Sequence, residues 1–88
     1  MNTYRPPQIL REWNKDIPSE EVQQLLVYED GYVCSASGRY AHSSGSTSCT
    51  WSEFLGGAID ALVTQTLGPK TLEEARQFVL ERQSRISS

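Results

Sequence analysis

Two helix-start signals in the second half of the chain constrain its fold more than any other feature. Thr50-Trp51-Ser52-Glu53 and Thr71-Leu72-Glu73-Glu74 both match the capping box. In this motif the Thr hydroxyl accepts from a free N–H group of the first turn, and the Glu side chain accepts from the Thr amide. Between them, Leu67-Gly68-Pro69-Lys70 contains residues that end one helix and separate it from the next. The sequence therefore predicts a C-terminal helical hairpin.

Apolar side chains recur at helical spacing in both predicted helices. In the first, over 51–66, they are Trp51, Phe54, Leu55, Ala58, Ile59 and Leu62, and in the second they are Leu72, Ala75, Phe78, Val79 and Ile86. Gly56 and Gly57 lie inside the first helix, where each costs about 1 kcal/mol relative to Ala. We expect the close approach of another backbone to explain them, and the alternative is a hinge or a notch that faces a ligand.

The first 30 residues also carry helix signals. Pro7 fits the first turn of a short helix whose apolar positions continue to Trp13. Ser19 followed by Glu20 and Glu21 matches the start of a second short helix, with a hydroxyl cap and acids at the positive end of the dipole. The sequence therefore predicts one or two short N-terminal helices.

The pattern changes to that of strands near residue 27. Asp30-Gly31 lies between Tyr28 and Tyr32, and a turn pair flanked by residues of high strand propensity predicts a hairpin. An alternative continues the preceding helix to Glu29, with Gly31 as its terminating left-handed residue, so that 19–29 is either helix or strand.

The region after this hairpin is predicted to end the sheet. Residues 32–37 alternate in the manner of a strand, Gly38 marks a second turn, and 39–43 can form a further edge strand. Residues 43–48 are mostly Ser and Thr without periodicity, and we expect a flexible connecting loop there, or alternatively a binding loop.

Together these signals predict an α+β fold in one domain of 88 residues. Short N-terminal helices precede a two- or three-stranded antiparallel meander over about 26–43, and the helical hairpin packs across one face of the sheet. We expect residues 1–6 and 85–88 to fray. The alternative is a mainly helical protein with a looped middle.

Composition and charge exclude some classes of function. The net charge is −3 and the pI is about 5.0, which argues against a general binder of nucleic-acid phosphates. The first residues lack an apolar run, so we expect neither a secretory signal nor a membrane span, and a cytoplasmic location. In that compartment Cys34 and Cys49 are expected to be reduced rather than bridged.

The cysteines and the single histidine form no strong chemical motif. Cys34, His42 and Cys49 supply three ligands without the tight pairs and the fourth ligand of a structural zinc site, so we expect no metal and no cofactor. Cys49 precedes a predicted helix and, with His42, outlines a nucleophile and its base. A buried Cys49 that packs on Phe54 as a hydrophobic staple explains the same position, and we favour it.

Other catalytic and nucleic-acid motifs are not matched. The chain has no G-x-S-x-G elbow and no glycine fingerprint for phosphate. A helix-turn-helix would place Leu72, Glu73 and Glu74 against DNA, where the acids would repel phosphates. We therefore expect a non-enzymatic protein that does not bind nucleic acid directly.

The remaining hypothesis is protein recognition through an acidic face. Residues 12–30 contain six acids against one lysine, a local balance of −5. Aromatic side chains interleave with these acids, and aromatic anchors beside charge are typical of interfaces with a basic partner. The predicted partner-binding residues are Trp13, Glu20, Glu21, Tyr28, Glu29, Asp30 and Tyr32. Basic surfaces often belong to nucleic-acid-handling complexes, in which carboxylates can occupy sites for phosphate.

In size, acidity and lack of catalytic signatures the chain resembles the small inhibitors that phages and mobile elements encode, such as anti-CRISPR and other anti-defence proteins. The resemblance covers overall character and no matched residues. It implies an inhibitor. We expect the protein to be a monomer or homodimer. Two alternatives are a small thiol-dependent enzyme that uses Cys49 and His42, and a virion or assembly protein with a self-associating edge strand.

Overall fold

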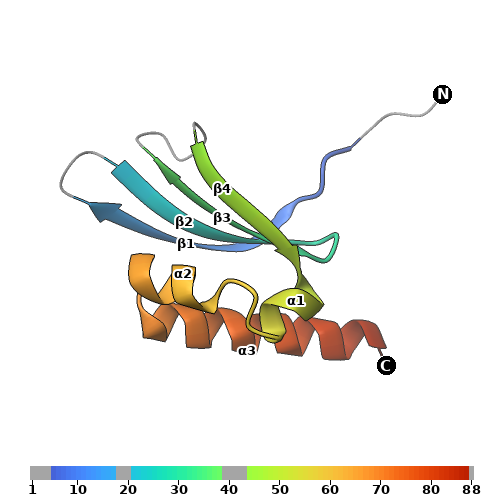
Figure 1. Ribbon diagram of the computed structural model, residues 1–88. Coiled ribbons are helices and arrows are strands. Elements are labelled where there is room, and N and C mark those ends of the chain that lie inside the picture. Colours follow the sequence, from blue (N-terminus) through green and yellow to red (C-terminus); the bar gives the residue numbers. More distant parts are fainter. Residues whose placement is uncertain (1–4, 18–20, 39–43, 88) are drawn as a thin grey trace.

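A computed structural model describes residues 5–17, 21–38 and 44–87. Four strands form one antiparallel sheet, and three helices lie against one of its faces (Figure 1). The α+β class predicted from the sequence is confirmed. The order is different, because all the strands come before the helices.

The sheet is a meander in which each strand pairs with the next one along the chain. The strands are β1 (Ile9–Ile17), β2 (Glu21–Tyr28), β3 (Tyr32–Gly38) and β4 (Ser44–Thr50), in the spatial order β1-β2-β3-β4. β1 and β4 are therefore the two edges. The far face of the sheet, which the helices leave open, is called the uncovered face below (Figure 1).

The helices follow the sheet without a linker. They are α1 (Trp51–Leu55), α2 (Asp60–Thr66) and α3 (Pro69–Ser87). α3 is the longest and runs beneath the sheet, with α1 and α2 between it and the strands in the view of Figure 1. No helix in the described part of the chain is long and apolar enough to cross a membrane.

The core lies between the sheet and the helices. Leu25, Val27 and Val33 contribute to it from the central strands, and Phe54, Val63 and Val79 contribute from the three helices; all six are fully buried. In the register, Val27 and Cys49 both lie opposite Val33. Alternate residues of these strands therefore face the helices, as the period of two in a strand requires.

The predicted N-terminal helices are wrong. The segment that begins near Pro7 is strand β1, and the segment after Ser19 is strand β2, while 18–20 lie outside the described residues. Cap-like residues such as Ser19 and Glu20 act locally, whereas the pairing of β2 with strands on both sides satisfies its whole backbone. The alternative helix through Glu29 is excluded for the same reason.

The Asp30-Gly31 hairpin is confirmed. β2 ends at Tyr28 and β3 begins at Tyr32, and the Gly31 amide donates to the Tyr28 carbonyl at 3.4 Å. Gly31 has a φ of +93°, which an L side chain rarely adopts. A local turn signal therefore located this hairpin correctly.

The Ser-rich loop predicted over 43–48 is wrong for most of its length. Residues 44–50 form the edge strand β4, whose Thr47 and Ser48 lie opposite Ser35 and Cys34 of β3. Strand formation here comes from backbone pairing, which small polar side chains permit at an edge. The edge strand expected over 39–43 lies outside the described residues.

The first capping box is confirmed and the second is not. The Thr50 hydroxyl accepts from the Glu53 amide at 3.1 Å, and the Glu53 carboxylate accepts from the Thr50 amide at 2.8 Å. α3 instead begins at Pro69, which lacks an amide hydrogen and fits the first turn of a helix. Thr71 therefore lies inside the helix, where its hydroxyl donates to the Leu67 carbonyl at 3.2 Å.

The single helix predicted over 51–66 is interrupted at Gly56 and Gly57, which separate α1 from α2. Gly57 has a φ of +99°, and a Cβ placed there would meet only the Asp60 side chain, at 3.5 Å. The expected close approach of another backbone is therefore wrong. Gly57 is needed for its left-handed conformation, which lets the chain turn between two short helices.

Candidate functional site

The β2–β3 turn lies where two pockets meet. Its tip, Glu29-Asp30-Gly31, is joined to the start of α1 because the Trp51 amide donates to the Gly31 carbonyl at 2.8 Å. One pocket opens on the uncovered face of the sheet and the other opens on the helix side. Asp30 lines both pockets and therefore lies between them.

The pocket on the uncovered face has a volume of about 280 Å³. Its wall residues are Pro7, Tyr28, Asp30, Tyr32, Cys34 and Ser48. Tyr28 and Tyr32 share this face with Cys34, because the residues between them along the strands, Val27 and Val33, point into the core. Tyr32 is 47% exposed, so a large aromatic surface is open to a partner here.

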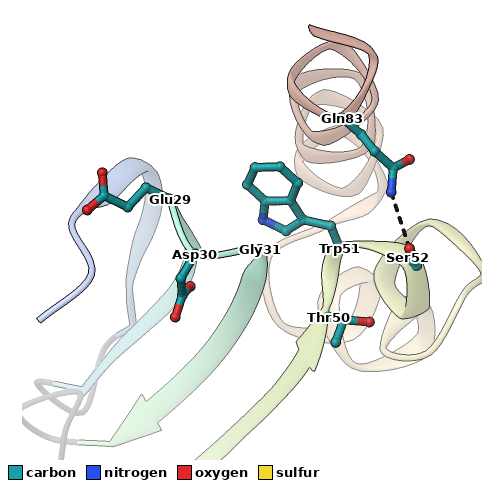
Figure 2. A pocket seen from close by; sticks show the side chains of 7 residues that line it. All are labelled: Glu29, Asp30, Gly31, Thr50, Trp51, Ser52 and Gln83. Atoms are coloured by element: carbon teal, nitrogen blue, oxygen red, sulfur yellow. Dashed lines mark hydrogen bonds between the residues drawn. The ribbon is translucent and has the colours of Figure 1, made fainter. Parts of the chain in front are cut away.

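The pocket on the helix side has a volume of about 330 Å³ and connects the sheet to two helices. Figure 2 shows its walls, which are Glu29, Asp30, Gly31, Thr50, Trp51, Ser52 and Gln83. The Gln83 side-chain amide donates to the Ser52 hydroxyl at 3.2 Å and thereby ties α3 to α1 at the rim. The indole of Trp51 lies between this pair and the turn (Figure 2).

The charges at the turn are negative and differ in their pairing. Glu29 lies 3.6 Å from the Arg5 guanidinium and accepts from the Gln8 amide at 3.1 Å, which holds the N-terminal lead beside the turn. Asp30 has no ion pair or hydrogen bond with any residue that the structure describes. An exposed carboxylate without an internal partner is available to a ligand.

Acids also lie on the uncovered face of β1. Glu12 is opposite Leu26 and Asp16 is opposite Val22, both at positions that alternate with core-facing residues of β2. At the strand positions that the structure describes, this face carries no Lys or Arg. Glu12 and Asp16 thus lie on the uncovered face, whereas Glu29 and Asp30 lie in the turn at the end of β2.

Four of the seven predicted partner-binding residues are brought together. Tyr28, Glu29, Asp30 and Tyr32 surround the β2–β3 turn and line its two pockets. We call these four residues the turn surface. Glu21 begins β2 at the opposite end of that strand, and neither its side chain nor Glu20 is among those the structure describes.

Trp13 is placed elsewhere, against the helices. Its ring meets Phe78 edge to face with centroids 6.2 Å apart, and its Nε1 donates to Glu74 at 3.1 Å. The Arg11 guanidinium lies 5.1 Å from the centre of the same ring. Trp13 therefore stabilises the packing of β1 on α3 instead of forming part of the turn surface.

Tyr28 and the two cysteines have raised pKa values, which favour their neutral forms. Burial, followed by the nearby Cys34 and Asp30, raises the pKa of Tyr28 above its usual value. Burial alone raises the pKa of Cys34, and burial followed by the charge of Glu53 and by Cys34 raises the pKa of Cys49. A raised thiol pKa disfavours the thiolate that a cysteine nucleophile requires.

Cys49 packs as the staple interpretation predicts. It is 7% exposed and belongs to the same core cluster as Phe54. Both cysteines are free thiols, and they lie on opposite faces of the sheet because Cys49 pairs with Val33, the neighbour of Cys34. His42 lies outside the described residues, and within the described ones no three His, Cys, Asp or Glu residues group to hold a metal.

Sequence reasoning missed the residues that complete the two pockets. Trp51, Ser52 and Gln83 form the helix side of one, and Pro7, Cys34 and Ser48 form much of the other. The position of Trp51 directly after the capping Thr50 was the only available signal, since it placed the indole at a helix start.

Comparisons of the chain with protein-family models, curated proteins and solved structures find no match.

Proposed function

We propose that the protein is a non-enzymatic binding protein whose turn surface docks on a basic surface of another protein. The observation that carries this proposal is the exposed Tyr32 ring beside the Asp30 carboxylate, which has no described partner within the chain. Aromatic side chains dominate the energetics of many interfaces, and unpaired charge directs the approach of an oppositely charged partner.

The distribution of charge supports a basic partner. Glu12 and Asp16 extend the negative surface across the uncovered face, and the basic residues of the described chain lie mainly on α3, on the other side of the molecule. A protein that binds nucleic acid presents a basic surface of the complementary kind. The activity we propose is inhibition of such a protein, as expected of the phage or mobile-element inhibitors that the chain resembles.

The test is quantitative capture of partners from a lysate of the source cells, followed by mass spectrometry. Immobilised wild-type protein is compared with Tyr32→Ser and with Asp30→Lys. Both side chains are exposed, so the substitutions should leave the core intact. We expect one basic protein to be retained by the wild type and to be lost from both variants.

Matched controls lie on α3. Leu80 is 51% exposed, close to the 47% of Tyr32, and Glu73 is an exposed acid outside both pockets. Leu80→Ser and Glu73→Lys should retain the partner. A partner that survives the Tyr32 and Asp30 changes, or that is lost equally from the α3 variants, would contradict the proposal.

A further inference from the structure

The helix-side pocket contains a buried hydrogen-bond donor without an acceptor. Trp51 is 5% exposed, and its indole Nε1 is buried with no hydrogen-bond partner. Among the described residues two other buried side-chain atoms share this condition, Gln23 Oε1 and Asp60 Oδ1, but neither residue lines this pocket. Because an unsatisfied buried N–H group is costly, an acceptor supplied from outside the chain would be stabilised here.

The surroundings of the indole show which groups remain to be satisfied. In Figure 2 the nitrogen lies on the side of the ring that is turned toward Asp30 and Gly31. On the other side of the pocket, Gln83 and Ser52 already bond to each other. The groups left over are thus one neutral donor within the pocket and the Asp30 carboxylate at its edge.

The charge of the pocket indicates a cationic ligand. Two acidic residues line it, Glu29 and Asp30, and no basic residue does; the Glu29 carboxylate points away from Trp51 in Figure 2, which leaves that of Asp30 for a ligand. Glu29 already lies 3.6 Å from the guanidinium of Arg5, so this turn attracts a group of that kind within the chain itself. A guanidinium matches a carboxylate geometrically and in charge, which favours arginine over lysine.

We propose that this pocket receives an arginine-containing segment of the partner protein, with a main-chain carbonyl accepting from Trp51 Nε1 and the guanidinium meeting Asp30. The volume of about 330 Å³ is near the lower end of the range for ligand pockets, consistent with one side chain and its peptide unit. The inference rests on the proposed function and names the chemistry by which the basic partner is held.

The two tryptophans of the chain provide the test and its internal reference. Trp13 Nε1 already donates to Glu74, whereas Trp51 Nε1 has no acceptor. The ¹⁵N-labelled protein is titrated with the peptide acetyl-Gly-Arg-Gly-amide, and the two indole N–H signals are followed by NMR. We expect the Trp51 proton to move downfield as it gains an acceptor, while the Trp13 signal stays in place.

Two further probes distinguish the role of the main-chain carbonyl from that of the guanidinium charge. The citrulline peptide acetyl-Gly-Cit-Gly-amide keeps the shape and the main-chain carbonyls of the arginine peptide but is neutral. It should bind about three- to fivefold more weakly, because an exposed ion pair contributes about that much to affinity. Ethylguanidinium carries the charge without a main-chain carbonyl and should leave the Trp51 proton unshifted. Equal binding of the citrulline peptide, or a downfield shift with ethylguanidinium, would contradict the assigned roles.

Two isosteric substitutions at exposed acidic residues complete the experiment. Asp30→Asn should lower the affinity for the arginine peptide by about three- to fivefold. Glu73→Gln, which removes one charge outside the pocket, should leave this affinity unchanged. If no probe shifts the Trp51 proton, no ligand carbonyl reaches it and the inference is wrong, even where partner capture still depends on Tyr32. Conversely, the Trp51 proton could shift with the arginine peptide while Tyr32→Ser still captures the partner. That result would contradict the proposed function and leave the arginine pocket standing.

Discussion

The Nε1 of Trp13 donates a 3.1 Å hydrogen bond to the Glu74 carboxylate, and this bond joins edge strand β1 to the long helix α3. Sixty-one residues separate the two positions in the sequence. Arg11 and Phe78 pack on the same indole, so this ring links the strand to the helix at that edge of the sheet.

Replacing Trp13 should therefore weaken the contact between β1 and α3. Trp13→Phe keeps an aromatic ring against Phe78 but removes the donor, and we expect the free energy of unfolding to fall by about 1–2 kcal/mol. Glu74→Gln retains an acceptor oxygen and should cost less than about 0.5 kcal/mol. Urea denaturation of both variants measures the difference, and an equal loss from the two would contradict the assigned bond.

The two Thr positions that resemble caps should respond differently to substitution. Thr50→Ala removes an N-cap whose hydroxyl accepts from the Glu53 amide, and it should cost about 1 kcal/mol of stability. Thr71→Ala replaces a residue inside α3 by a better helix former and should change stability by less than about 0.5 kcal/mol. Thermal unfolding of the two variants distinguishes a cap from an interior hydroxyl, and a greater loss at Thr71 would contradict the start of α3 at Pro69.

The adjacent glycines between α1 and α2 should also differ. Gly57→Ala places a Cβ on a residue with a φ of +99° and should destabilise the protein by about 1–2 kcal/mol. Gly56 has a φ of −81°, and a Cβ there would make ordinary contacts of 3.4 and 3.5 Å with backbone oxygens. Gly56→Ala should then be neutral or stabilise by up to about 1 kcal/mol. The order of the two midpoints in urea is the readout, and the reverse order would exclude the turn described for 56–59.

Stability should fall at alkaline pH because of Cys49. Its pKa in the folded state is raised above the usual value of 9.0, chiefly by burial, so the folded state retains the thiol proton longer than the unfolded state. The resulting stabilisation is present below pH 9 and is lost as the pH rises through the folded pKa.

Unfolding in urea under reducing conditions, repeated from pH 7 to pH 10.5, measures this loss. Cys49→Ala should flatten the decline above pH 9, while Cys34→Ala provides the comparison for a thiol that is only partly buried. An unchanged slope in Cys49→Ala would contradict the prediction.

Short-range signals in the sequence predicted the fold well where the structure is itself local. The Asp30-Gly31 hairpin and the Thr50 cap each depend on residues within a few positions of one another, and both were located correctly. The Thr71 motif failed because Pro69, two residues earlier, also starts a helix.

The first strand shows why longer-range structure was misread. Leu10 and Trp13 both pack on the core, although a regular strand would send these positions to opposite faces. The register of β1 shifts between Ile9 and Arg11, and this bulge reproduces the apolar spacing of a helix. A bulge depends on pairing with β2, which no local pattern reveals.

The turn surface was predictable and its pockets were not. Tyr28, Asp30 and Tyr32 lie within five residues of one another, so a hairpin prediction gathers them. The Gln83–Ser52 bond that closes the helix-side pocket spans 31 residues and depends on how α3 packs against α1. Such a contact follows from the tertiary arrangement alone.

The sequential order of the meander has a consequence for synthesis on the ribosome. Each strand can pair with the one made just before it, yet Ala75 and Val79, which cover the inner face, emerge only after the whole sheet. A nascent chain that ends before Pro69 lacks α3, so Leu25, Val27 and Val33 are only partly shielded from water. This incomplete intermediate is the species most prone to aggregate or to recruit a chaperone.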